Sequence, residues 1–204
     1  IACDHLGEAA LIANIDTPVS NIEKIAARHF AVERRNLLRC NLWNWALEET
    51  LVTRNGGPKL GFADAYTKPS DFIRYVGINT DDANYAYKPV RSRISGNSIL
   101  LDNDGSASAK LVYIADITDV TLWDAAWTKA FTLALALAMA FQVTKDEKIV
   151  QRVNGLFDAA LADAISSDGQ ENPPLRYERS PIIEARKGYY GDSVGYDNTR
   201  YNLP

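Results

Sequence analysis

The stretch that decides the fold is LWDAAWTKAFTLALALAMAFQV, residues 122–143, which commits more consecutive apolar residues than any other part of the chain. At 3.6 residues per turn its apolar side chains cover every side of a helix, so no polar face remains after Lys129. The uncharged run from Ala130 to Phe141 is shorter than the roughly 20 residues that cross a bilayer. Its alanine content favours a helix over a strand. We therefore expect a buried core helix and no membrane insertion.

The composition is that of an ordinary globular protein. The 204 residues are 47% hydrophobic and 24% charged, and the formal net charge of -4 gives no general attraction to nucleic acid or to anionic membranes. The two cysteines, Cys3 and Cys40, lie far apart and form no CxxC motif, which favours a reducing compartment over a disulfide scaffold. The first residues lack the basic and apolar regions of a signal peptide, so we expect none.

Capping signals predict where the other helices begin. Ser20 and Glu23 form an S-x-x-E box at the start of a helix of about five turns, and Thr144 and Glu147 form a T-x-x-E box before a later one. Apolar residues recur at helical spacing after each box, at Ile22, Ala26, Phe30, Leu37 and Leu38 and at Ile149, Val153, Phe157, Ala160 and Ala164. A shorter helix over residues 8–15 precedes Pro18, and residues 166–169 end the last helix. Two tryptophans, Trp43 and Trp45, follow the second helix and are expected in the core.

The middle of the chain is rich in short strand-like runs. These runs are residues 47–53, 85–88, 90–95, 98–102 and 110–114. Gly96 and Asn97 predict a tight hairpin turn, residues 102–105 a longer one, and residues 70–76 a helical turn. The sequence therefore predicts an α+β fold that is mainly α. It consists of an antiparallel bundle of about four helices (residues 1–46 and 119–168), a small antiparallel β-rich insertion (47–118) and an extended C-terminal tail (169–204).

The predicted tail has no helical or strand period. Its basic and acidic residues nearly cancel, while its tyrosines supply large contact areas on short side chains. We expect the tail to bind a partner, and the alternative is a tail that wraps its own domain. The partner-binding candidates are Tyr177, Arg179, Tyr189, Tyr190, Tyr196 and Tyr201.

A basic stripe lies opposite the apolar side of the second helix. It consists of Lys24, Arg28, Arg35 and Arg39. Such a stripe is either a solvated face or a surface for a polyanion or an acidic partner, including the wall of a channel.

Motifs for chemistry are sparse. The chain has only two histidines, His5 and His29, and neither a P-loop nor G-x-G-x-x-G, so we expect no catalytic residues and no cofactor. Cys3 and His5 offer two metal ligands without a second pair, and residues 102–105 lack the flanking ligands of a calcium loop, so we expect no metal. The carboxylate pairs Glu48-Glu49 and Asp81-Asp82 leave one enzymatic alternative, glycan hydrolysis, which needs two carboxyl groups across a cleft.

The order of these elements resembles the head-to-tail adaptor proteins of tailed bacteriophages, particularly the tail tubular protein A family of short-tailed phages. The similarity covers residues 6–168 and lies in Ala9 to Ile15, Ala26, Phe30, Arg35, Leu38, Trp43 to Ala46, and the helix pair of residues 122–165. Residues 56–82 and the tail depart from the family pattern.

The resemblance implies a structural protein of the virion and no enzymatic activity. Such an adaptor forms a homo-oligomeric ring of twelve copies between the portal protein and the tail nozzle protein, and double-stranded DNA passes through it without sequence-specific binding. Assembly would take place in the host cytoplasm, from subunits that are monomers when free. The alternatives are a polysaccharide hydrolase activity carried by a tail protein and a plain helical protein-binding module.

Overall fold

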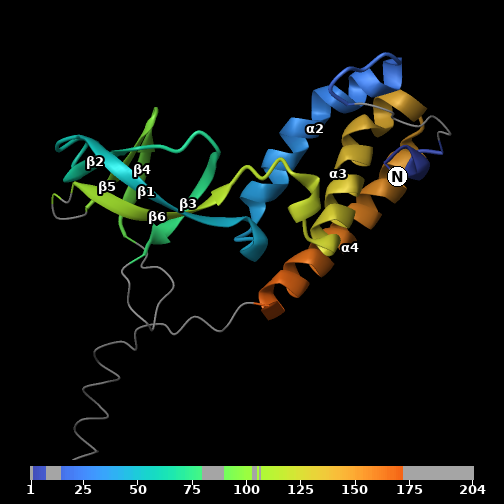
Figure 1. Cartoon of the computed structure of the whole chain (residues 1–204). Helices are drawn as coiled ribbons and strands as arrows, with labels where there is room; N and C mark the ends of the chain where they lie inside the picture. The colour runs from blue at the N-terminus through green and yellow to red at the C-terminus, as the bar shows by residue number, and fades with distance from the viewer. Residues whose placement is uncertain (1, 8–14, 80–89, 103–104, 106, 172–204) are drawn as a thin grey trace, which may run out of the picture. The chain divides into compact units, whose positions relative to one another are not determined.

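A long apolar helix, α3 (Ala125–Thr144), lies between α2 (Asn21–Cys40) and α4 (Glu147–Glu171) and contacts both (Figure 1). A short helix, α1 (Ala2–His5), also packs on α3. The computed structural model describes residues 2–7, 15–79, 90–102, 105 and 107–171. Residues Ile1–Pro173 form one compact unit.

The central part of α3 is buried, as its sequence predicts. Trp127, Leu133 and Met139 are at most 3% exposed. The two ends of the apolar stretch differ from the expectation, because Leu122 belongs to a 3-10 turn, η2 (Val120–Leu122), and both Leu122 and Phe141 are largely exposed. The helix is therefore enclosed over its middle turns and presents an apolar side chain to solvent near its end.

α3 has the length and composition of a membrane span, the one such helix among the described residues. Half of that stretch is buried inside the protein, against α1, α2 and α4. The core helix of a globular domain passes the same length and composition test, and this degree of internal burial fits a core helix.

The capping box at the start of α2 forms as predicted. The Ser20 hydroxyl accepts from the Glu23 amide at 3.2 Å, and the Glu23 carboxylate accepts from the Ser20 amide at 2.8 Å. The predicted box of Thr144 and Glu147 is wrong, because Thr144 is the last residue of α3 and its hydroxyl donates to a carbonyl of that helix. Asp146 caps α4 instead, where its carboxylate accepts from the Lys148 amide at 2.9 Å.

Within the described residues, six strands form one antiparallel sheet in the order β3-β6-β1-β2-β5-β4. The strands are β1 (Leu47–Gly56), β2 (Asp64–Thr67), β3 (Phe72–Ile78), β4 (Ser92–Ser95), β5 (Ser98–Leu101) and β6 (Ser108–Ala115). The predicted hairpin turn at Gly96 and Asn97 joins β4 to β5, and Gly96 has a φ of 60°, a conformation that glycine adopts readily.

The expected fold class, a helix bundle with a small β-rich insertion, is wrong. The strands form a curled six-stranded sheet of half-barrel shape beside the four helices. The physical reason lies in β6, whose side chains are buried on both faces of the sheet. Leu111 and Tyr113 point into the curled sheet, whereas Val112 and Ile114 pack in the same cluster as Trp127 of α3. The sheet and the helices therefore share a core, and the sheet is not a peripheral insertion.

The sequence patterns did not predict strands β2 and β3. β2 is buried along its first three residues, Asp64 to Tyr66, so it shows no alternation of polar and apolar side chains. β3 was expected to be a helical turn at residues 70–76, but it pairs with β6, and two register shifts interrupt its alternation.

Two predictions cannot be compared with the structure. The helix predicted over residues 8–15 lies outside the described residues except for Ile15, and the strand predicted over residues 85–88 lies outside them completely. At the other end, α4 continues through Glu171, so residues 169–171 of the predicted tail are helical. Trp43 is buried, with its indole nitrogen donating to the Leu37 carbonyl at 2.8 Å, and Trp45 is half-buried against Trp127.

We predict that Leu133→Ala lowers the free energy of unfolding by about 2–5 kcal/mol, because it removes a buried side chain and leaves a cavity between α3 and its neighbours. Leu122→Ala is the matched control, since 62% of Leu122 is exposed, and it should cost less than about 0.5 kcal/mol. Urea unfolding of both variants measures the difference. Equal losses would contradict the assignment of the core.

Candidate functional site

Several charged side chains meet where α2 lies beside the end of β6. Asp116 follows β6 directly and accepts two hydrogen bonds from Arg34 of α2, from Nε at 2.8 Å and from Nη2 at 3.0 Å. Arg35 donates to the same carboxylate from Nε at 2.7 Å. The Asp116 and Arg34 side chains are 6% and 9% exposed, whereas Arg35 is 62% exposed. A single carboxylate thus joins α2 to the end of β6 through one buried arginine and one exposed arginine.

The charge of this carboxylate is favoured by its partners. Burial alone raises the pKa of Asp116, but hydrogen bonds and positive charge from Arg34 and Arg35 outweigh burial and bring the pKa below its ordinary value of 3.8. Asp116 is therefore ionised at neutral pH, and the three side chains together carry one net positive charge.

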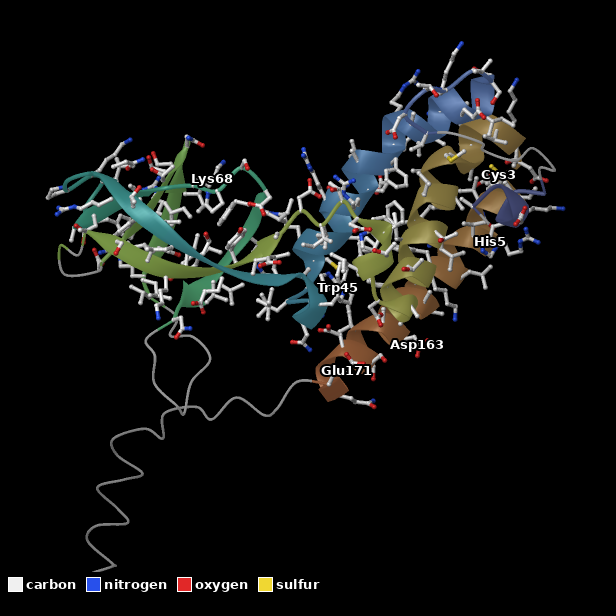
Figure 2. The ribbon with its side chains drawn as sticks, in the orientation of Figure 1. Cys3, His5, Trp45, Lys68, Asp163 and Glu171 are labelled. Carbon is white, nitrogen blue, oxygen red and sulfur yellow. The ribbon has the colours of Figure 1, made fainter. Side chains whose placement is uncertain are left out.

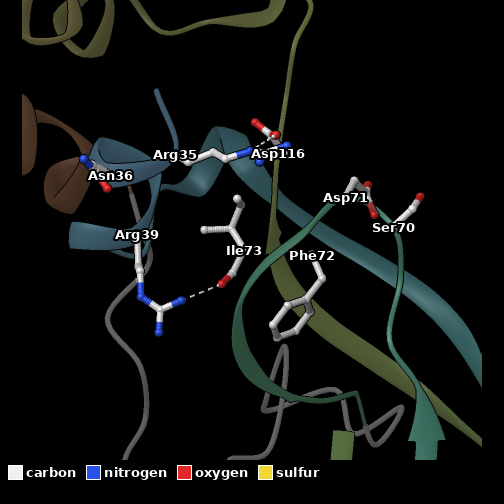
Figure 3. Close-up of a pocket in the computed structure, with 8 residues that line it drawn as sticks. All are labelled: Arg35, Asn36, Arg39, Ser70, Asp71, Phe72, Ile73 and Asp116. Atoms are coloured by element: carbon white, nitrogen blue, oxygen red, sulfur yellow. Dashed lines mark hydrogen bonds and ion pairs between the residues drawn. The ribbon is translucent and has the colours of Figure 1, made fainter. Parts of the chain in front are cut away.

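An open groove of about 300 Å³ lies beside this ion pair (Figure 3). It is lined by Arg35, Asn36, Arg39, Ser70, Asp71, Phe72, Ile73 and Asp116. Arg39 donates to the Ile73 carbonyl at 3.0 Å, so a second guanidinium of α2 is held against β3. Both arginines keep further N–H donors that these contacts do not use.

One wall of the groove carries a hydrogen-bonded carboxylate. The Tyr113 hydroxyl donates to both oxygens of Asp71, at 3.1 and 3.2 Å. Burial and the negative charge of Asp71 raise the pKa of Tyr113 well above its ordinary range, so the phenol stays protonated. Tyr113 therefore acts as a fixed donor and not as a base. The groove presents two guanidinium groups, two carboxylates, one amide and one hydroxyl group, a set that suits contact with a partner's polar groups.

The four residues of the predicted basic stripe are all exposed along α2, but they differ in their surroundings. Arg35 and Arg39 contact the sheet, whereas Lys24 and Arg28 lie nearer the start of the helix. The stripe is therefore partly structural, because half of it helps to attach α2 to the sheet. The partner-binding candidates of the tail, Tyr177, Arg179, Tyr189, Tyr190, Tyr196 and Tyr201, lie outside the described residues.

The sequence patterns missed Arg34 and Asp116. Arg34 is adjacent to Arg35, yet its side chain points toward the buried side of α2. Neighbouring residues of a helix do not face the same side, so the helical spacing alone gives no reason to expect that both arginines bind one carboxylate. The available signal was the position of Asp116, a charged residue directly after a strand that is apolar on both faces. Such a carboxylate is near the core and needs a cationic partner.

The carboxylates of the hydrolase alternative do not meet in the described part of the chain. Glu48 and Glu49 are adjacent in β1, so their side chains point to opposite faces of the sheet. They pair with Tyr113 and Val112, which belong to different sides of β6. These two carboxyl groups cannot flank one cleft. Asp81 and Asp82 lie outside the described residues.

The weak metal signal at the start of the chain does not develop into a cluster. Figure 2 labels Cys3 and His5 on α1, where Cys3 is buried among apolar side chains of the helices. Among the residues that the structure describes, no three histidine, cysteine, aspartate or glutamate side chains are grouped so that they could hold a metal ion. No protein-family model matches this chain, and no curated protein matches it either.

We predict that Asp116→Ala lowers the free energy of unfolding by about 3 kcal/mol at pH 7, because it leaves Arg34 buried without its charged partner. This loss is at the lower end of the range for breaking a buried ion pair, because the exposed Arg35 can be solvated by water in the variant. Because folding lowers the pKa of Asp116, the stabilisation exists above pH 3.8 and disappears as the pH falls through the folded-state pKa.

Urea unfolding at a series of pH values between 7 and the acid range measures both effects. The exposed Asp163 provides the matched control, and Asp163→Ala should leave unfolding nearly unchanged. A difference between wild type and Asp116→Ala that stays constant into the acid range would rule out the charge of Asp116 as its cause.

Proposed function

We propose that this protein is a structural adaptor of a bacteriophage virion, a subunit of a ring that joins the portal protein to the tail nozzle and continues the channel for the genome. The observation that carries the proposal is the order and joining of elements along one compact unit. A capped helix, α2, leads through an aromatic turn into an antiparallel sheet. Two helices follow, of which α3 packs on α2 and α4 packs on α3. This is the order on which the resemblance to the tail tubular protein A family rests.

The ion pair at Asp116 supports the proposal physically. An adaptor works by holding surfaces in fixed positions, and here the sheet is attached to α2 by Arg34, Arg35 and Arg39 in addition to the shared apolar core. A ring subunit needs such stiffness, because a small change of angle at each contact prevents closure. The copy number of twelve, the portal and the nozzle remain part of the proposal and come from the resemblance.

Two other functions are weaker candidates. The hydrolase alternative needs two carboxyl groups that flank one cleft. Glu48 and Glu49 cannot supply them, because their side chains lie on opposite faces of β1. A plain helical binding module does not account for the six-stranded sheet, which shares its core with the helices.

Negative-stain electron microscopy tests the proposal. We predict that the chain, mixed with the portal protein encoded in the same genome, forms rings attached to the portal, whereas an unrelated portal gives none. Absence of any ring and of any portal binding would reject the adaptor function.

The proposed role of the C-terminal residues gives a separate prediction. Deleting residues 173–204 should change the melting temperature by less than about 3 °C, because the compact unit extends only to Pro173. The same deletion should abolish binding to the portal. A second variant keeps the full length of the chain and replaces only the tyrosines with serine. It should also lose binding to the portal; the replaced residues are Tyr177, Tyr189, Tyr190, Tyr196 and Tyr201. A large drop in melting temperature would show that these residues stabilise their own domain.

A further inference from the structure

The two outer helices of the domain carry opposite charge. α2 and α4 flank α3, and both contact it (Figure 1). The C-terminal part of α4, residues 153–171, contains four acidic residues and no lysine or arginine. Three exposed cations lie around the start of α2, namely Lys24 and Arg28 on the helix and Lys145 at the end of α3. The exposed carboxylates there include Asp16 and Asp146, of which Asp146 caps α4. The domain is therefore electrically asymmetric across α3.

The basic side also has an apolar component. Phe141 and Val32 are 71% and 52% exposed. Phe141 borders an open pocket of about 490 Å³, whose lining includes Ile25, Arg28 and Lys145. An apolar floor with cations at its rim suits an apolar side chain that is accompanied by a carboxylate. We call Lys24, Arg28, Val32, Phe141 and Lys145 the basic face.

The outer side of α4 has the complementary chemistry. Asp158 and Asp163 are exposed, and so are two apolar side chains, Leu156 and Ile165. Between them the helix surface is flat, because its central positions recur at spacings of four, three and four residues and are occupied by Gly155, Ala159, Ala162 and Ser166, all exposed. We call Leu156, Asp158, Asp163 and Ile165, with these small residues, the acidic face.

We infer that the basic face of one copy binds the acidic face of the next copy. This inference rests on the proposed function, to which it adds the two surfaces that meet between neighbouring subunits. The aspartates of α4 lie opposite Lys24, Arg28 and Lys145, while Leu156 or Ile165 fills the pocket beside Phe141. The small residues of α4 let the partner helix approach closely.

The arrangement favours a second copy over nucleic acid as the partner. The basic face supplies three positive charges and two large apolar side chains, whereas non-specific DNA binding depends almost entirely on contacts with phosphates. The two faces differ from each other and lie on opposite sides of α3, so the contact is heterologous. A heterologous contact adds copies in one direction and generates a ring when the rotation between neighbours closes.

Charge reversal with rescue tests the inference. Lys24→Glu with Arg28→Glu reverses the basic face, and Asp158→Lys with Asp163→Lys reverses the acidic face. Because free subunits are expected to be monomers when dilute, the concentration series extends into the range in which wild type associates. Sedimentation velocity should then show each double variant associating at least about tenfold more weakly than wild type, because like charges meet. The quadruple variant should return to within about threefold of wild type, since the charges are again complementary.

Controls separate this effect from misfolding. Arg93 lies on β4, outside both faces, so Arg93→Glu should associate as wild type does. Gly155→Leu is a steric probe, because a Cβ at Gly155 meets no atom within 4 Å and the subunit itself has room. It should weaken association while circular dichroism and the melting temperature stay close to those of wild type.

A crosslinking pair keeps the test decisive even where a charge-reversed variant does not fold. In a Cys40→Ser background, Val32→Cys and Ala162→Cys are prepared separately, mixed and oxidised. A disulfide-linked dimer should form in the mixture and not in either variant alone.

Three results would overturn the inference. The first is unchanged self-association of both double variants, and the second is the absence of a mixed disulfide. The third is a basic-face variant that binds a 30-base-pair duplex DNA more weakly while it self-associates normally. Rings on the portal that form equally well with every variant would leave the adaptor function standing and reject these two faces. Failure of wild type to bind the portal, together with rescued self-association of the quadruple variant, would reject the adaptor function and retain the interface.

Discussion

The structure depends on the burial of strand β6 on both of its faces. Alternate side chains of a strand point to opposite sides, so Leu111 and Tyr113 fill the curled sheet while Val112 and Ile114 pack with the helices. Because all four are at most 6% exposed, moving this strand would disturb two clusters at once. The ion pair of Asp116 with Arg34 directly follows this strand, and it fixes the end of β6 to α2. The sheet and the helices are thus joined in one domain by apolar contacts and by a buried ion pair.

This joining explains why the helices were easier to predict than the sheet. The positions of α2 and α3 follow from a capping box and from a run of apolar residues, both of which are local patterns. The strands owe their stability to partners far away in the sequence, as when β3 pairs with β6. β2 is buried throughout its first three residues and includes Asp64, whose charge is met by Arg54 from the neighbouring strand at 2.9 Å. Local patterns cannot reveal such long-range pairing, so the sequence predicted a small insertion where the domain has a six-stranded sheet.

The candidate site shows the same limit at the level of single side chains. The spacing along α2 correctly groups four exposed cations, but it cannot tell that Arg35 and Arg39 reach the sheet while Lys24 and Arg28 do not. That difference comes from the position of β3 and of Asp116 beside the second half of the helix. A charged stripe read from sequence is therefore a mixture of structural and free cations, and only the free ones are available to a partner without loss of stability.

The rigidity of α3 determines what the two flanks of the domain can do. Its middle turns bury both alanines and large side chains such as Trp127 and Phe131 against α2 and α4. The separation and angle between the outer faces of α2 and α4 are then determined by packing, since interiors this dense resist deformation. In a heterologous assembly the same angle is repeated at every contact, and small errors accumulate around the ring. In the proposed ring, a helix that is buried over its middle turns would hold the two oppositely charged surfaces of each subunit at a constant angle.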